Sequence, residues 1–174
     1  MSHDVLGKIA VELVKTRIPG TRKGSEEPAY EHSLRIYKAL QSYGYDEEVC
    51  LAGLLHDIVE DSTVTFEELE QLGFSDRVIQ LVRWCSHDET IEDGDARWVM
   101  MMANLVEAKD ADAWAIKVAD VTDNLQSSHL LTADRARLMQ QVKAPLILRL
   151  ATPYLKTEPV WKALEKALLP YAQP

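Results

Sequence analysis

The segment HDIVED, residues 56–61, gathers side chains that bind metal ions or exchange protons into a short stretch of chain. An imidazole beside carboxylates is a mixed nitrogen and oxygen donor set, which suits manganese, iron or zinc better than calcium. If a helical turn continues through the segment, the four-residue spacing stacks Glu60 over His56, and likewise Asp61 over Asp57. Carboxylates held that close repel one another unless one is protonated or a cation lies among them. The segment therefore indicates a divalent-metal site, with a solvated acidic helix end as the alternative.

Two other helices are expected to bring groups of the same kind. His32 lies early on a helix predicted to begin at Pro28 and to run to about residue 43. Downstream, a helix predicted over about residues 112–127 carries Asp120, and Asn124 lies one turn later. An aspartate within an otherwise apolar helical stretch needs a partner, which makes Asp120 a further candidate ligand.

The order of these residues resembles a known ligand set. His32, the His56-Asp57 pair and Asp120 follow one another as in the H…HD…D set of the HD superfamily of metal-dependent phosphohydrolases. Within it, HDIVEDS and KVADVTDNL are similar to the HDxxED and KxADxxxN motifs of the Rel/SpoT-type alarmone hydrolase domain, over about residues 15–125. The resemblance implies one divalent metal ion on these four side chains, with Mn²⁺ first and Fe²⁺, Zn²⁺ or Mg²⁺ as alternatives.

The fourth ligand and the catalytic groups have their own alternatives. On spacing alone Asp123 competes with Asp120, and the ADxxxN pattern favours Asp120. Glu60 and Asp61, placed beside the ligands, are expected to orient the attacking water and to move protons, with at least one perturbed pKa. The resemblance assigns the same role to this pair.

A basic island precedes the first histidine. Residues 13–25 contain several bases and no acid, although the whole chain has a net charge of −9. Such an island can hold a phosphorylated small molecule, or it can be an ordinary solvated loop. The resemblance implies that Arg22 and Lys23 lie against the nucleotide. Asn124 is expected to hydrogen-bond a sugar or phosphate of the substrate, unless it bonds its own helix.

The expected substrate is a small phosphorylated nucleotide, and the first hypothesis is hydrolysis of the 3′-pyrophosphate of guanosine tetraphosphate (ppGpp). The chain departs from the family's usual RKSGxPYxxHP loop, since Tyr30 is shifted by one place, and Gln126 replaces an Arg that often follows the last ligand. A second enzyme hypothesis therefore keeps the same site but assigns a different substrate, either a nucleoside monophosphate or a phosphorylated dinucleotide cofactor. The third is an HD domain that binds a nucleotide or a partner protein without turnover, although no ligand or catalytic carboxylate is missing.

Composition and periodicity predict an all-α fold, a compact multi-helix bundle forming one domain over residues 1–174. The acidic net charge argues against a nucleic-acid partner, and the lack of a long apolar stretch argues against a membrane span, so we expect a cytoplasmic protein. An oligomer is possible, but its state is not predicted. Cys50 and Cys85 are expected to be buried free thiols.

Several helix boundaries and side-chain environments are predicted as well. His87 and Asp88 are expected in a polar loop, and Trp98 to Met102 as a core stripe. The expected helices and caps are 4–15, 47–55 capped by Asp46, 65–73 opened by Thr65, 75–85 capped by Ser75, 96–108 opened by Asp95 and 132–142 capped by Thr132, with Pro145, Pro153 and Pro159 dividing the remainder.

Overall fold

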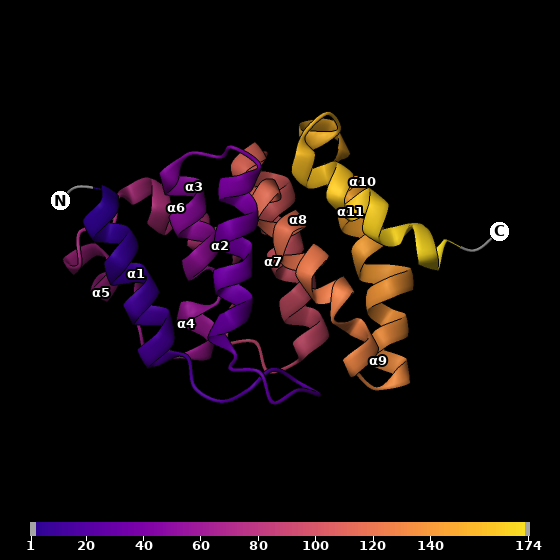
Figure 1. Cartoon of the computed structure of the whole chain (residues 1–174), viewed down its shortest axis with the longest axis horizontal. Helices are drawn as coiled ribbons and strands as arrows, with labels where there is room; N and C mark the ends of the chain where they lie inside the picture. Colours follow the sequence, from indigo (N-terminus) through magenta and orange to yellow (C-terminus); the bar gives the residue numbers. More distant parts are fainter. Residues whose placement is uncertain (1–2, 173–174) are drawn as a thin grey trace.

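The structure, a computed structural model, describes residues 3–172 and their side chains from Val5 onward. Within that range the regular elements are helices, apart from one isolated antiparallel bridge between Thr21 and Pro28, so the predicted all-α fold is confirmed (Figure 1). The elements are α1 (His3–Arg17), α2 (Tyr30–Ser42), α3 (Glu47–Leu55), α4 (Ile58–Asp61), α5 (Phe66–Gln71), α6 (Asp76–Cys85), α7 (Gly94–Ala108), α8 (Ala111–Gln126), η1 (Ser128–Leu130), α9 (Ala133–Leu138), η2 (Met139–Lys143), α10 (Ala144–Leu155), α11 (Pro159–Leu168) and η3 (Leu169–Tyr171).

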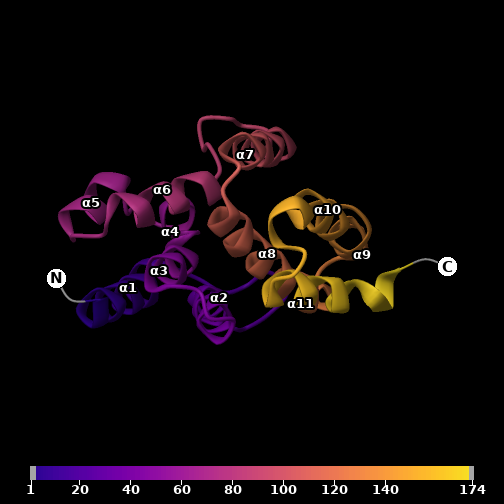
Figure 2. The ribbon, with the colours of Figure 1, turned by 90° about the horizontal axis from the view of Figure 1, so that it is seen from above.

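Helix α8 is the centre of the bundle. It packs against α2 and α3 on one side and against α10 and α11 on the other (Figure 2). Every residue from Ala113 to Thr122 is buried, and two of them, Lys117 and Asp120, carry charge. A helix that is buried all round normally carries apolar residues, so these two charges must find partners inside the protein.

The predicted caps explain where three helices begin. Asp46, Thr65 and Ser75 each accept a hydrogen bond from the backbone N–H three residues later, at 3.0, 3.2 and 3.3 Å, and so start α3, α5 and α6. Helix α7 begins differently from the prediction. Asp93, and not Asp95, is its cap and accepts from the backbone N–H of Ala96 at 2.8 Å.

Helix α2 begins two residues later than predicted. Pro28 is not its first residue, because the bridge to Thr21 holds Pro28 in the preceding loop. Backbone hydrogen bonds from Arg22 N to Glu27 O, 2.9 Å, and from Ala29 N to Gly20 O, 3.1 Å, close this loop. The basic island therefore ends in a hydrogen-bonded loop that leads directly into the helix of His32.

The C-terminal half corrects a second boundary. The helix predicted to end near Val142 continues through the π-helical segment η2 into α10, and Thr132 makes no side-chain cap. Pro145 lies in the first turn of α10, and Pro153 lies inside α10. Only Pro159 begins a new helix, at the first position of α11, where a missing N–H costs nothing.

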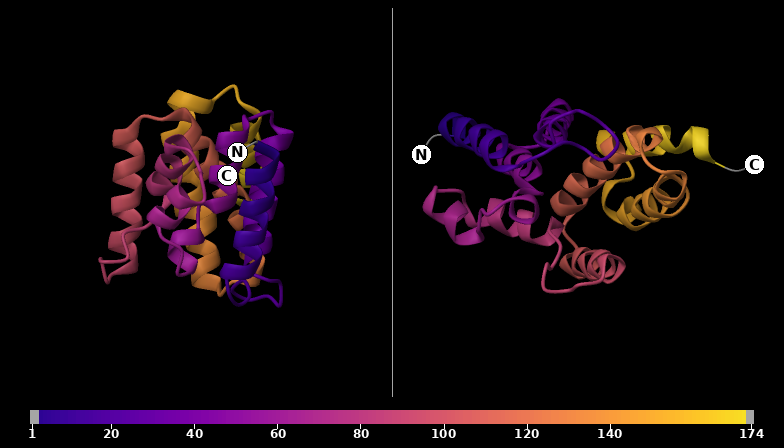
Figure 3. Two further views of the ribbon diagram at one scale, coloured as in Figure 1. Left: turned by 90° about the vertical axis from the view of Figure 1, so that its left-hand side faces the viewer. Right: turned by 90° about the horizontal axis from the view of Figure 1, so that it is seen from below.

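Other side chains lie as their types indicate. Cys50 and Cys85 are buried free thiols, as predicted. The predicted core stripe is only half right, because Met101 and Met102 are buried whereas Val99 and Met100 are exposed on α7. Helix α7 packs mainly on α6 and stands at the side of the bundle (Figure 3). Among residues 3–172, no helix combines the length and the hydropathy that spanning a bilayer requires.

Candidate metal centre

His56 and Asp57 lie at the junction between α3 and α4, beside the middle of α8. His56 is 1 % exposed, and its Nδ1 lies 2.8 Å from the carbonyl oxygen of Gly53. A carbonyl only accepts, so Nδ1 carries a hydrogen, and Nε2 is the ring nitrogen that is directed away from α3 toward the carboxylates. That Nε2 is buried and makes no hydrogen bond to any described residue. An unsatisfied buried nitrogen is costly, and a metal ligand is one of the few reasons for a protein to keep one.

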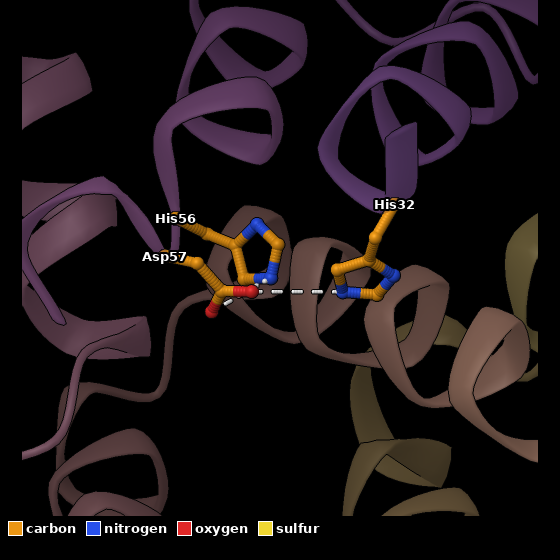
Figure 4. A group of neighbouring side chains, drawn as sticks. All are labelled: His32, His56 and Asp57. Carbon is orange, nitrogen blue, oxygen red and sulfur yellow. Dashed lines mark ion pairs between the residues drawn. The ribbon is translucent and has the colours of Figure 1, made fainter. Parts of the chain in front are cut away.

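His32 approaches the same point from α2. It is 3 % exposed, and its Nδ1 lies 2.7 Å from Oδ2 of Asp123. The imidazoles of His32 and His56 meet edge to face with centroids 5.3 Å apart, and Figure 4 shows both rings directed toward Asp57. One ligand atom from each of these three residues lies within 4.8 Å of the others. Two nitrogens and a carboxylate therefore converge at one point.

The two carboxylates complete the arrangement. Oδ1 of Asp57 lies 3.1 Å from Nε2 of His56. Asp120, 5 % exposed on α8, places Oδ1 3.3 Å from Nε2 of His32 and 3.9 Å from that of His56. Its other oxygen is 2.8 Å from Nζ of Lys117, the buried cation of α8. The structure thus brings together all four residues that the sequence predicts as ligands, and we name them the metal cluster.

Protonation in the cluster follows from the mutual attraction of these groups. Burial lowers the pKa of His56, but the negative charges of Asp57 and Asp120 outweigh it and raise the pKa to about 9. Burial acts on Asp120 in the opposite sense, and the positive charge of Lys117 and the hydrogen bond from His32 hold its pKa well below the usual range. Without a metal ion the cluster therefore favours imidazolium paired with carboxylate, and a divalent cation would replace those protons.

Asp123 faces the outer edge of His32. Its carboxylate accepts the hydrogen bond from His32 Nδ1 and also binds Arg35, at 2.6 Å to Nε and 3.0 Å to Nη2. Arg35 in turn contacts Glu27 at 2.7 Å. Glu27 lies in the loop of residues 20–29 that leads into α2, which we name the basic loop. Because Asp123 lies on the Nδ1 side and Asp120 on the Nε2 side, the geometry favours Asp120 as the ligand. Asp123 instead orients the ring of His32, as outer partners of metal-bound histidines do.

Glu60 and Asp61 lie one turn beyond the ligands but in different environments. Both oxygens of Glu60 are bound by His87, at 2.8 Å to the backbone N–H and 2.5 Å to Nδ1. His87 does lie in the predicted loop, yet the sequence offered no sign of this contact. The carboxylate of Asp61 makes no hydrogen bond or ion pair with any described residue. Partial desolvation, together with the negative charges of Asp57 and Glu60, raises its pKa.

The predicted substrate-binding residues lie beside the cluster. Arg22 donates from Nη2 to Asn124 Oδ1 at 2.9 Å and to Ser127 Oγ at 3.1 Å, so the basic loop is attached to the end of α8. Asn124 also donates to Oδ1 of Asp120 at 2.5 Å. This is the alternative named for Asn124, a side-chain hydrogen bond within its own helix α8. Lys23 is exposed.

Gly24 fixes how closely the basic loop approaches the rest of the protein. Its φ is +79°, and a Cβ there would lie 2.0 Å from the carbonyl oxygen of Leu130 in η1. A side chain at this position is therefore excluded both by the backbone conformation and by the close contact.

Sequence reasoning missed a further cation, Lys143. This residue is half-buried at the end of the π-helical segment η2, and its ammonium lies 4.9 Å from the ring centroid of Trp98. Burial lowers its pKa, and the charges that act on it include Asp95, Lys117, Asp120 and Lys23. It forms no ion pair within the described part of the chain. We name Arg22, Lys23 and Lys143 the basic rim. A π-helical turn often lies at a functional position, but no sequence pattern predicted this one, which is why Lys143 was missed.

Comparisons with known proteins place the chain among relatives of similar sequence and fold. The bifunctional (p)ppGpp synthase/hydrolase SpoT of Escherichia coli K12 is 31 % identical over 150 residues, which cover 80 % of this chain and 21 % of that protein. The chain thus spans about a fifth of the length of such relatives. The solved structure of a metazoan SpoT ortholog, described as hydrolysing ppGpp, superposes with a TM-score of 0.80 at 24 % identity and covers 93 % of each chain.

A second solved structure and a family model point the same way. A Listeria monocytogenes EGD-e protein gives a TM-score of 0.65 at 26 % identity, over 79 % of this chain and 90 % of that one. The model of the HD domain matches residues 10–152, most of the chain. The match includes all four residues of the metal cluster. The chain therefore belongs to the HD domain family.

Proposed function

We propose that this protein is a metal-dependent phosphohydrolase that removes the 3′-pyrophosphate of ppGpp-like alarmones. The observation that carries the proposal is the buried Nε2 of His56, which lacks a hydrogen-bond partner and faces the carboxylates of Asp57 and Asp120. Relatives that share this HD domain are named ppGpp 3′-pyrophosphohydrolases, which supports the same reaction here. We propose one such domain over residues 1–174, acting in the cytoplasm without a nucleic-acid or membrane partner.

The residues present fit a divalent metal ion, which proteins of this family bind. His32, His56, Asp57 and Asp120 would hold it, and this nitrogen and oxygen donor set leads us to propose Mn²⁺ before Fe²⁺, Zn²⁺ or Mg²⁺. A divalent metal at this position supplies Lewis acidity, which polarises a phosphate oxygen and lowers the pKa of water. Lys117 lies at 2.8 Å from Asp120 and keeps that carboxylate ionised and oriented.

The reaction requires a water oxygen to bond to phosphorus while the bond from phosphorus to the 3′-oxygen breaks. One proton leaves the water, and the 3′-oxygen gains one. Glu60, whose carboxylate is fixed on both oxygens, is suited to orient the water and to accept its proton. Asp61, with its raised pKa and no bound partner among the described residues, is suited to carry a proton between water and leaving group.

The substrate would lie between the metal cluster and the basic rim. Lys23 is exposed, and Lys143 has no ion-pair partner in the described structure, so both are free to bind phosphate oxygens. Arg22 already binds Asn124, and this pair presents a guanidinium and an amide next to Asp120. We propose that these residues bind the phosphates and the ribose of the nucleotide.

A product analysis tests the proposal. Metal-free protein is loaded with Mn²⁺, Fe²⁺, Zn²⁺ or Mg²⁺ and incubated with ppGpp, and the products are separated by anion-exchange chromatography. We expect GDP and pyrophosphate in equal amounts. Glu60→Gln and Asp61→Asn should retain metal and turn over at least about 10²-fold more slowly, because each loses a proton-transfer group. Release of orthophosphate, or a preference for nucleoside monophosphates, would replace the proposed substrate, and no turnover with any nucleotide would make the protein a binding module.

A further inference from the structure

His87 lies outside the metal cluster, in the loop between α6 and α7, yet both of its hydrogen-bonding contacts go to Glu60. Its backbone N–H donates to Oε1 at 2.8 Å, and its Nδ1 lies 2.5 Å from Oε2. The side chains of Glu60 and His87 are 14 % and 28 % exposed. Because a carboxylate only accepts, Nδ1 is the protonated nitrogen of the ring.

The surroundings show why Glu60 needs such a contact. Helix α4 has a single turn, Ile58–Asp61, so its backbone offers little support to a long side chain. His87 supplies every hydrogen bond that the carboxylate of Glu60 makes within the described residues. The start of the loop contacts the backbone of a ligand, since Ser86 Oγ lies 3.3 Å from His56 O, in addition to its 2.9 Å bond to Val82 O in its own helix α6. The loop thus extends from the backbone of one ligand to Glu60.

We propose that His87 is a positioning residue that holds the Glu60 carboxylate in the orientation needed to align the attacking water. The proposal rests on the proposed role of Glu60 in hydrolysis. Two donors on two different oxygens fix both the rotation and the plane of the carboxylate, and each oxygen keeps a lone pair for water. Asp61, the other proposed proton-transfer group, has no such support. An orientation fixed before the substrate arrives raises the rate of the chemical step rather than the affinity.

Four single variants and one double variant test this role. His87→Ala removes the Nδ1 donor and leaves the backbone N–H. His87→Asn restores a donor, because the Asn amide nitrogen occupies nearly the position of Nδ1. Asp88→Ala is the control in the same loop, since the Asp88 carboxylate accepts hydrogen bonds from the backbone N–H of Thr90, at 2.9 Å, and from its hydroxyl, at 2.6 Å, and makes none with Glu60. Glu60→Gln, alone and combined with His87→Ala, completes a double-mutant cycle.

We expect His87→Ala to lower kcat by roughly tenfold with KM and metal content unchanged, and His87→Asn to recover most of the loss. Asp88→Ala should match the wild type. In the Glu60→Gln background, His87→Ala should add less than about a twofold loss, because the group that it positions is already gone. Wild-type kcat in His87→Ala, no recovery in His87→Asn, or fully additive losses would each overturn the proposal.

A measurement without substrate separates this proposal from the proposed function. In metal-free protein carrying ¹⁵N-labelled histidine, the His87 ring should be protonated at Nδ1, and its signal should shift in Glu60→Gln. An unshifted signal would show that the contact is absent, whatever the enzyme hydrolyses. Wild-type turnover by Glu60→Gln would remove the catalytic role of Glu60 itself, and the role of His87 with it. A slow Glu60→Gln beside a fully active His87→Ala would overturn the role of His87 alone.

Discussion

The metal cluster and the basic rim lie side by side, but their side chains are held in opposite ways. In the cluster, His32, His56 and Asp120 are at most 5 % exposed, and the outer nitrogen of each imidazole binds an acceptor of its own. In the rim, Lys23 is exposed, and Lys143 has no ion-pair partner among the described residues. The cluster is organised before any ligand binds, whereas the two lysines of the rim keep charges without an ion-pair partner in the described structure, and only Arg22 is already held, by Asn124, Ser127 and Asp123.

This contrast separates two properties of the enzyme. Preorganised groups act on the chemical step, because they need not reorganise as charge develops. Cations that bind the phosphates away from the reacting bond act mainly on affinity, because they attract a phosphorylated ligand in the ground state and in the transition state alike. We therefore expect changes in the cluster to affect metal content and kcat, and changes in the rim to affect KM.

The largest effect should come from His56→Ala. Loss of the buried Nε2 removes a ligand and the contact that it makes with Asp57, so metal content should fall from about one ion per chain to below about a tenth. Turnover should fall with it. Metal analysis after gel filtration measures the change, with His129→Ala as the control, because His129 is exposed and contacts only the backbone of its own turn. Equal metal content in the wild type and in His56→Ala would contradict the assignment of the cluster.

A smaller effect is expected from Asp123→Asn. The amide no longer offers a charged acceptor to Nδ1 of His32 and Arg35, so the ring loses its fixed orientation. Metal affinity should fall about 10- to 100-fold, as for other outer-shell partners of ligand histidines. Glu27→Gln is the matched control, because it alters the other partner of Arg35 at a more exposed position. Affinities measured by competition with a chelator should separate the two variants, and equal losses would mean that Arg35, not the His32 contact, matters.

Variants of the basic rim should have the opposite signature. Replacing both Arg22 and Lys23 by Ala should raise KM by about tenfold, with metal content unchanged and kcat changed much less. Lys23→Ala should show the effect in its simplest form, because Arg22 also attaches the loop to Asn124 and Ser127. Lys162→Ala, an exposed lysine on α11, is the control. A fall in kcat with constant KM would place these cations in the chemical step and so remove the contrast between cluster and rim.

The smallest effect concerns pH. The folded pKa of His56 is raised to about 9 from an ordinary value of 6.5, so its pairing with Asp57 stabilises the metal-free fold fully below pH 6.5 and less as the pH rises through 9. Metal binding has the opposite trend, because protons compete with the metal ion for the ligands. Below the pKa, the apparent affinity should rise with pH by up to about tenfold per pH unit for each proton displaced. Calorimetry at pH 7 in buffers of different ionisation enthalpy should show proton release. Binding without proton release would contradict the imidazolium state of the metal-free cluster.

Helix geometry predicted that the side chains of residues 56–61 lie together, whereas the full set of four ligands was predicted from the resemblance of their order to the H…HD…D set. Asp46 caps the start of α3, whose apolar residues run to Leu55, and His56 and Asp57 follow directly. Asp120 stands out because a buried helix should not carry an unpaired aspartate. The helical fold was predictable for the same reason, since caps and periodicity are local signals.

The remainder of the site depends on contacts between distant segments, which local patterns do not encode. His87 is 27 residues from Glu60, and only the packing of the loop against α4 brings them together. The position of the Lys143 side chain depends on the π-helical turn before α10, where the sequence analysis predicted the end of a helix instead. The predicted start of α2 at Pro28 was wrong, because the bridge between Pro28 and Thr21 outweighs the preference of proline for the first helical turn.

The most direct test of the account is anomalous diffraction from crystals grown with Mn²⁺. The account predicts one strong anomalous peak per chain, bounded by Nε2 of His32, Nε2 of His56 and the carboxylates of Asp57 and Asp120, and no peak in crystals of His56→Ala. The account would be contradicted by a principal peak that lies beside Glu60 and Asp61 and away from the histidines. A wild-type crystal with no peak at the cluster would contradict it as well.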